Sequence, residues 1–412
     1  MGAKSFLARA RIAQGVAESH LGEGEKALAD FDEARALCES ASDRLCAAEA
    51  LLAAGLWLVQ TGDSDQAGAR LDQATAIAKE ASAYGALLDG LDAFASTLAR
   101  RGELRAAREH YGTLAGRAEE LGLRRRQAMA LLSAGAVDAE RGEPAATAEV
   151  ESLRKLAGGL GDPELSAAVE VAHGGLELRQ GELAAARADV QKGLPALRAI
   201  GAKRLLAPAL GSWGALLTES DPAHAAEAFD EQANVAEQLG DSGQFTSSRA
   251  ARAVVAAEDG RAAEAIGQLR EASRRLAELH WLDAQARVLS WLAALLAREG
   301  YVKDASDAVR DAAALKTENA WTALALDITS ARLRLDLPEG ADPAAEVAPL
   351  RQRAVKQHYP QLDLEAQLAA AEIDLASGNK PRGRARLVAL AKDASAKGFT
   401  RISRRASALA RK

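Results

Sequence analysis

The chain has 412 residues, a formal net charge of −6 and 48% hydrophobic residues, so it can bury a large core. No uninterrupted apolar run reaches the roughly 18 residues that a membrane helix needs, and the N-terminal residues lack the apolar core and cleavage site of a signal peptide. We therefore predict a cytoplasmic protein with no membrane partner.

A turn residue recurs along the chain at a nearly constant interval. The turn positions are Gly22, Gly62, Gly102, Gly142, Gly181, Ser220, Gly260, Gly300, Gly340 and Gly378. A second series of small residues precedes the turns with the same period, at Gly15, Gly55, Ala95, Gly135, Gly174, Gly214, Ala253, Ala293, Ala331 and Ala371. Two series with one period predict about ten copies of a single structural unit.

Each unit is predicted to contain two helices, such as 43–61 and 64–81 in the second unit. Gly62 follows the first of these helices, where glycine readily adopts the left-handed conformation of a helix end. Gly55 lies inside the first helix, where the missing side chain lets the second helix approach. We assign such turn or packing roles, rather than chemical ones, to Gly15, Gly55, Gly62, Gly102, Gly135, Gly174, Gly260 and Gly300.

The second helix of a unit carries an alanine, a large apolar residue and another alanine on one face. Examples are Ala27, Phe31 and Ala34; Ala67, Leu71 and Ala74; Ala265, Leu269 and Ala272; and Ala305, Val309 and Ala312. This pattern resembles the tetratricopeptide repeat over essentially the whole chain. The resemblance implies an all-α, right-handed α-solenoid of about ten helix-turn-helix repeats at 1–398, followed by a solvated, basic capping helix at 399–412.

The period of about 40 residues departs from the common 34-residue repeat. It resembles the long-helix variety found in C-terminal arrays of bacterial serine/threonine kinases or winged-helix regulators. That narrower resemblance implies that a kinase or DNA-binding domain lies outside this sequence.

The sequence offers no catalytic constellation, because it has no phosphate-binding loop after a strand, no nucleophile elbow and no metalloprotease motif. We predict no enzyme and no cofactor. Cys38 and Cys46 are expected to be two small buried thiols; a disulfide is the alternative if a helix hairpin turns between them. No histidine or further cysteine lies within zinc-ligand spacing of them, and the six histidines are scattered, so we predict no metal site.

A binding face is predicted along the first helices of the repeats. Its candidate partner-binding residues are Leu52, Leu56, Val59, Asp89, Asp92, Ser96, Arg100, Arg287, Ser290 and Arg332. The alternative is that each packs between repeats or belongs to a solvated face. A second row, Trp281, Trp321, Tyr359 and Phe399, recurs at the joins between repeats. We interpret this row as hydrophobic staples that fix successive helices rather than as a ridge for a partner.

Charge is uneven, since residues 380–412 carry a net charge of +10 within an acidic chain. We therefore compare three functions. The leading hypothesis is a protein- or peptide-binding scaffold that serves as the sensing or docking region of a bacterial signalling or regulatory protein. A sensor of a small molecule or signal peptide is the alternative, and nucleic-acid binding through the basic segment is the least favoured because the chain is acidic overall.

Overall fold

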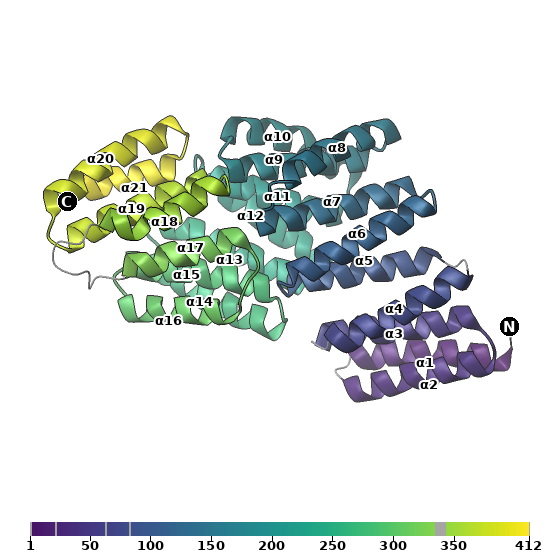
Figure 1. The fold of residues 1–412 in the computed structure, drawn as a ribbon. Coiled ribbons are helices and arrows are strands. Elements are labelled where there is room, and N and C mark those ends of the chain that lie inside the picture. The colour runs from purple at the N-terminus through teal and green to yellow at the C-terminus, as the bar shows by residue number, and fades with distance from the viewer. Residues whose placement is uncertain (1, 21–22, 62–63, 82–83, 334–342, 412) are drawn as a thin grey trace. The chain divides into compact units, whose positions relative to one another are not determined.

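In the computed structural model, the described residues 2–20, 23–61, 64–81, 84–333 and 343–411 form α-helices joined by short turns and contain no strand (Figure 1). The all-α prediction is confirmed. The helices are α1 (Ala3–His20), α2 (Gly24–Ser40), α3 (Arg44–Thr61), α4 (Ser64–Ala81), α5 (Tyr84–Arg100), α6 (Leu104–Glu120), α7 (Arg124–Arg141), α8 (Ala146–Leu160), α9 (Pro163–Gln180), α10 (Leu183–Ile200), α11 (Lys203–Thr218), α12 (Pro222–Gln238), α13 (Ser242–Glu258), α14 (Ala262–Glu278), α15 (Leu282–Arg298), α16 (Val302–Ala314), α17 (Ala320–Leu333), α18 (Pro343–Lys356), α19 (Pro360–Ala376), α20 (Lys380–Ala396) and α21 (Thr400–Ala410).

The chain divides into two compact units, residues 1–134 and 135–412, and the boundary falls inside α7. In the first unit α1 packs on α2, α3 on α4 and α5 on α6, while α1 also contacts α3 and α3 contacts α5. In the second unit the helices from α9 to α20 pair in the same way, and first helices of neighbouring repeats touch, as α15 and α17 do. This is the predicted solenoid of helical hairpins. The division into an array at 1–398 and a cap at 399–412 stays a prediction.

The small residue in the first helix lies where the second helix comes closest. A Cβ atom added at Gly174 of α9 would stand 2.8 Å from Cγ2 of Val190 and 2.9 Å from the carbonyl oxygen of Ala186, both in α10. The same addition at Gly15 would meet the ring of Phe31 at 2.7 Å. At Gly15, Gly55 and Gly174 a Cβ atom would fall within 3.0 Å of the second helix, and at Gly135 it would lie 3.5 Å from Val150. The close approaches at the first three positions agree with a packing role.

Turns between helices use residues in the left-handed conformation. Gly102, Gly260 and Gly300 have φ values between 81° and 85°, as predicted for turn glycines. The turn positions Gly22, Gly62 and Gly340 lie outside the described residues. At two joins between repeats a histidine takes this conformation instead, since His280 and His358 both have a φ of 56°.

The two cysteines of the first unit are bonded. Cys38 near the end of α2 and Cys46 near the start of α3 form a disulfide, with their Cα atoms 5.5 Å apart. The expectation of two free thiols is therefore wrong. The physical reason is the tight hairpin at 41–43, where Ser42 adopts a φ of 55° and turns the chain back on itself.

The second unit brings its two ends into contact, because α19 packs on α9 (Figure 1). A Cβ atom added at Gly181, just after α9, would stand 2.4 Å from Pro360 and 3.4 Å from Phe399. Phe399 is 1% exposed and Ile402 of α21 is also 1% exposed. The expectation that this last segment is solvated is wrong for Phe399, which precedes α21, and for the face of α21 that carries Ile402, since both are buried inside the unit.

The recurring aromatic residues pack inside the structure. Tyr359 and Phe399 are buried, and Trp281 and Trp321 are partly buried against hydrophobic clusters. A Cβ atom added at Gly243 would stand 2.2 Å from the ring of Trp281. These burials agree with the staple interpretation, because residues covered in this way form no exposed ridge.

We expect Gly174→Ala to lower the free energy of unfolding of the second unit by about 1–3 kcal/mol, because its methyl group would collide with the backbone of α10. The matched control is Gly267→Ala in α14, where a Cβ atom would meet nothing within 4 Å. The control should gain up to about 1 kcal/mol from helix propensity. Urea unfolding midpoints measure both changes, and an equal shift in the two variants would contradict the packing role.

We expect reduction of the disulfide to speed amide hydrogen exchange in α2 and α3, because the bond restrains a short loop of the unfolded chain, an effect worth about 2 kcal/mol. The Cys38→Ser/Cys46→Ser double variant should exchange equally fast with and without reductant. Free thiols in the unreduced protein, together with no response to reductant, would refute this expectation.

Candidate functional site

The interior of the second unit contains a chain of charged side chains of alternating sign. It comes from α11, α17, α19 and α21, and we call it the inner ion-pair cluster. Its members are Glu219, Arg401, Glu365, Arg332, Glu372 and Arg405, in the order in which they touch.

Contacts in the inner ion-pair cluster join the two ends of the unit. Arg401 Nε lies 3.0 Å from Glu219 Oε1, and its Nη2 lies 3.2 Å from Glu365 Oε1. Arg332 lies 3.4 Å from Glu365, and its Nε is 2.6 Å from Glu372 Oε2. Arg405 completes the chain at 2.7 Å from Glu372. Three guanidinium groups therefore balance three carboxylates within the unit.

Glu219 connects the middle of the second unit to its last helices. It follows α11 and is 3% exposed. Besides Arg401, its carboxylate accepts a hydrogen bond from Gln361 at 3.3 Å, and its carbonyl oxygen accepts one from the hydroxyl of Thr400. A buried carboxylate without such partners would be strongly unfavourable. Glu219 therefore ties the sixth repeat to the start of both α19 and α21.

The cluster lies inside the protein and yet meets solvent. Arg401 keeps 22% of its side chain exposed and Glu365 keeps 16%. Burial opposes the charge on Arg401, but attraction to Glu219 and Glu365 outweighs it and raises the pKa of Arg401. Burial likewise opposes ionisation of Glu365, and Arg401 with Arg332 reverses this and lowers the pKa of Glu365. The charged forms of Arg401 and Glu365 thus stabilise each other.

A second group of charges faces the same interior from α7, α9 and α15. Burial raises the pKa of Glu140, and the nearby charge of Asp283 raises it further against the attraction of Arg287 and Arg179. Burial raises the pKa of Tyr359, and the nearby charge of Arg179 opposes this rise. Because these residues come from repeats far apart in the sequence, they mark the inner face of the unit.

Three of the predicted partner-binding residues, Arg287, Ser290 and Arg332, belong to the second unit. Arg332 belongs to the inner ion-pair cluster, and Arg287 pairs with Asp283 at 3.4 Å. Ser290 is 3% exposed, so its hydroxyl is enclosed by protein. Two of these three side chains, Arg332 and Arg287, therefore form ion pairs with carboxylates of the second unit.

The residues predicted for the first unit fall into two sets. Leu52 packs on α5, since a Cβ atom added at Gly90 would stand 2.0 Å from its Cδ1. Leu56 is half-buried, and the side chain of Val59 lies outside the described residues. For Leu52 the alternative of inter-repeat packing therefore accounts for its position.

The polar residues predicted on α5 gather at one tyrosine. Ser96 hydrogen-bonds the hydroxyl of Tyr111, and the charges of Asp92 and Arg100 act on it. Burial is the main reason that the pKa of Tyr111 rises to about 12. Asp89 lies apart from this group, 2.8 Å from Arg126.

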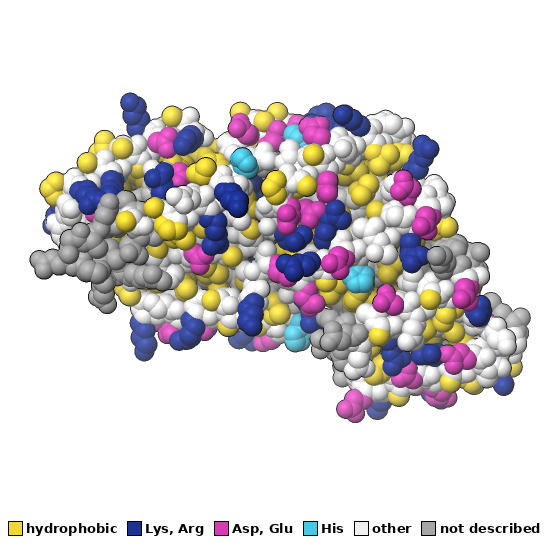
Figure 2. Space-filling view, viewed as in Figure 1, with side chains coloured by type: hydrophobic (Ala, Val, Ile, Leu, Met, Phe, Trp, Pro, Cys, Tyr) yellow, Lys and Arg dark blue, Asp and Glu magenta, His cyan; other side chains and the backbone are white. Residues whose placement is uncertain are grey.

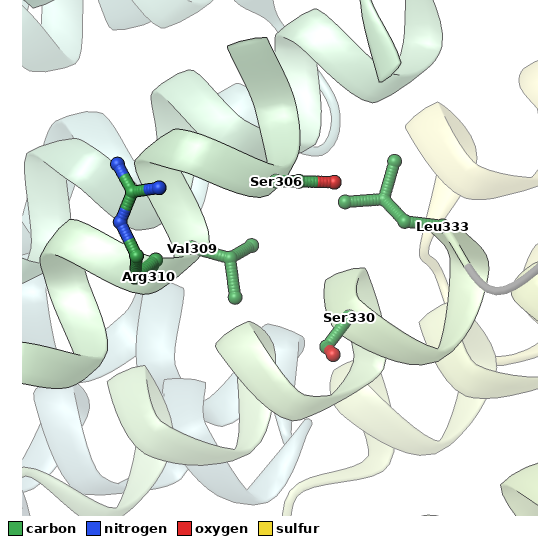
Figure 3. A pocket seen from close by; sticks show the side chains of 5 residues that line it. All are labelled: Ser306, Val309, Arg310, Ser330 and Leu333. Atoms are coloured by element: carbon green, nitrogen blue, oxygen red, sulfur yellow. The ribbon is translucent and has the colours of Figure 1, made fainter. Parts of the chain in front are cut away.

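A small pocket lies between α16 and α17. Its volume is about 250 Å³, below the usual range of small-molecule sites. Figure 3 shows the guanidinium of Arg310 turned away from Leu333 and Ser330. Arg310 instead lies 2.7 Å from Asp307. This pocket therefore lacks the convergent polar groups of a ligand site.

The basic segment uses several of its charges internally. Arg401 and Arg405 belong to the inner ion-pair cluster, Arg386 lies 3.2 Å from Asp374, and Lys397 lies 2.8 Å from Asp393. On the face shown in Figure 2, positive and negative side chains are interspersed over the described helices. Charges engaged in this way offer little to a polyanion.

Sequence reasoning identified only Arg332 of the inner ion-pair cluster and missed its other five members. Glu365 pairs with Arg332 and Arg401 at separations of 33 and 36 residues, which do not match the repeat period. An ion pair can be anticipated from the repeat period when its two residues occupy the same position in neighbouring repeats. Arg298 and Glu258 are such a pair, since they are 40 residues apart and their charged atoms lie 2.6 Å from each other.

Comparison with known families identifies the repeat. Residues 6–80 match the family model described as tetratricopeptide repeat. Residues 6–80 are therefore tetratricopeptide repeats, and the helices that follow pair as hairpins in the same way. A comparison with the curated proteins finds no match.

Several solved structures are similar to this chain. The Rap protein complexed with Competence and Sporulation Factor has a TM-score of 0.53 at 11% identity, covering 95% of this chain and 99% of that chain. IFIT1, solved as a monomeric mutant with Gppp-AAAA, has a TM-score of 0.46 at 11% identity, with coverages of 97% and 89%. Yeast Tom70 has a TM-score of 0.36 at 13% identity, with coverages of 99% and 96%. Among the described residues, no helix is both long and apolar enough to span a bilayer.

The carboxyl groups of Glu365 and Glu140 should change the stability of the second unit with pH in opposite directions. The pKa of Glu365 is lowered on folding, so its stabilising contribution exists above the unfolded pKa of about 4.3 and disappears as the pH falls through the lower folded value. Glu365→Gln should cost about 3 kcal/mol at pH 7, and this cost should shrink below about pH 4.3.

Glu140 is the matched opposite case, because its pKa is raised on folding. Its ionisation destabilises the folded state as the pH rises above about 4.3, so Glu140→Gln should stabilise the second unit at pH 7 and have little effect below that pH. Urea unfolding at several pH values measures both variants. Destabilisation by Glu140→Gln at pH 7 would contradict the geometry described for this group.

Proposed function

We propose that this chain is a non-enzymatic scaffold that binds a protein or peptide and serves as the sensing or docking region of a bacterial signalling or regulatory protein. The observation that carries the proposal is the charged inner face of the second unit, which is enclosed by protein and still meets solvent. Repeat arrays present extended concave surfaces to partners in this way.

The similar fold of a Rap protein complexed with Competence and Sporulation Factor is consistent with a polypeptide ligand. Bacterial serine/threonine kinases and winged-helix regulators carry arrays with the long repeat period seen here, which supports the signalling part of the proposal. We place the protein in the cytoplasm on this basis, although disulfides such as Cys38–Cys46 are more common in oxidising compartments.

The chemistry of the inner face favours a ligand with charged side chains of both signs. Such a ligand can exchange its own carboxylates and cations for those of the inner ion-pair cluster. Removing a buried charge from its partner is unfavourable unless a new partner replaces it. A charged peptide therefore fits this face better than an apolar one.

A site-specific crosslinker tests the binding face. We would place a photo-crosslinking phenylalanine derivative at Arg287, which faces the interior with 36% of its side chain exposed, and at Arg274 of α14, which is 61% exposed and pairs with Glu271 and Glu278 on its own helix. The intact chain would be irradiated in a lysate of the source organism. We expect a discrete protein or peptide adduct from position 287 and none from position 274. Identical adducts from both positions, or none from position 287, would refute the proposal.

A further inference from the structure

A histidine of α9 lies among carboxylates of three helices. His173 is 8% exposed, on the side of α9 that contacts α8 and α10. We call the group around it the His173 cluster, which comprises Glu151 and Arg154 of α8, Glu170, His173 and Glu177 of α9, and Asp189 and Lys192 of α10.

Three members of the His173 cluster point donor atoms at one location. His173 Nδ1 lies 2.6 Å from Asp189 Oδ2 and 3.5 Å from Glu177 Oε1. Donor atoms of all three residues lie within 4.8 Å of one another. Two donors bound tetrahedrally to zinc at about 2.1 Å lie about 3.4 Å apart. The His173–Glu177 separation already matches this value, and the His173–Asp189 separation needs to open by less than about 1 Å.

The other ring nitrogen of His173 has the partner that a metal-bound histidine usually has. Nε2 lies 3.2 Å from Glu151 Oε1. In the structure Nδ1–H donates a hydrogen bond to the Asp189 carboxylate, because an ionised carboxylate can only accept. A metal bound to Nδ1 would require the proton to lie on Nε2, where the Glu151 carboxylate would accept it. Glu151 thus orients the imidazole while Nδ1 faces Glu177 and Asp189.

Charge and hydrogen bonding in the His173 cluster both leave room for a cation. Four carboxylates face two cationic side chains, Arg154 and Lys192, so the cluster carries two excess negative charges when His173 is neutral. Glu177 Oε2 is buried and makes no hydrogen bond. Asp189 Oδ2 also accepts a hydrogen bond from Arg154 at 2.7 Å, and its second lone pair, which now accepts from His173, is the one that a metal would take.

We propose that His173, Glu177 and Asp189 form a binding site for a divalent transition-metal cation of the zinc class. One nitrogen and two carboxylate oxygens suit such a cation, whereas calcium and magnesium prefer all-oxygen sites. Three protein ligands leave a coordination position for water or for a group from a ligand. The bound cation would clamp α9 to α10 and thereby stiffen the fifth repeat. This inference is independent of the proposed scaffold function.

Metal titration of the full chain tests the site after treatment with a chelator. We expect one equivalent of Co²⁺ to produce visible absorption bands and Zn²⁺ to displace it and raise the thermal unfolding midpoint. His173→Gln and Glu177→Gln should each weaken Zn²⁺ binding at least about 100-fold. Glu177→Gln has nearly the same shape as the natural residue, and circular dichroism checks that both variants remain folded.

The control is His224→Gln. His224 Nδ1 also lies 2.6 Å from a carboxylate, that of Asp221, but on an exposed surface without the second acidic ligand. This variant should bind Zn²⁺ like the natural chain. Failure of the natural chain to bind Zn²⁺ or Co²⁺ at millimolar concentration would overturn the proposal, as would undiminished binding by both Glu177→Gln and His173→Gln.

Discussion

In each repeat the second helix lies against the first at a place where the first has almost no side chain. At Gly174 the neighbouring helix comes so close that even a methyl group would collide with the carbonyl oxygen of Ala186. Helices that approach in this way bury their facing surfaces almost completely, as Ala27 and Phe31 show in the first repeat. The dimensions of the hairpin follow from this contact, and stacking of similar hairpins then follows from their similar shape.

The inner face of the second unit is a consequence of that stacking. First helices of successive repeats are neighbours, and charged side chains of α17, α19 and α21 meet Glu219 in the interior of the unit. Charges from repeats distant in sequence meet there, and burial removes most of the solvent from each. Arg401 therefore contacts both Glu219 and Glu365. Because these charges are partnered, any group that entered would have to replace an existing partner.

The hairpin and its period were predictable because they depend on local spacing. Gly174 and Val190 belong to the two helices of one hairpin, and residues of the same kind recur in the other repeats, so the pattern is visible in the chain itself. The contact between Glu219 and Arg401 could not be predicted from the sequence, because it depends on how far the stack of hairpins curves over several repeats. Each repeat adds a small rotation that no single residue specifies. The His173 cluster was missed for a related reason, since its ligands sit on different helices and only His173 and Glu177 share a face.

The contact between α9 and α19 changes how the second unit should fold. An open array behaves as a one-dimensional chain in which each repeat senses only its neighbours, so end repeats fray independently of the middle. Here the last helices rest on Gly181 and Glu219, which lie several repeats earlier in the chain. Opening either end then exposes surface on both, which links their unfolding into one event. The same long-range contact raises the contact order of the unit, so it should fold more slowly than an open array of equal length.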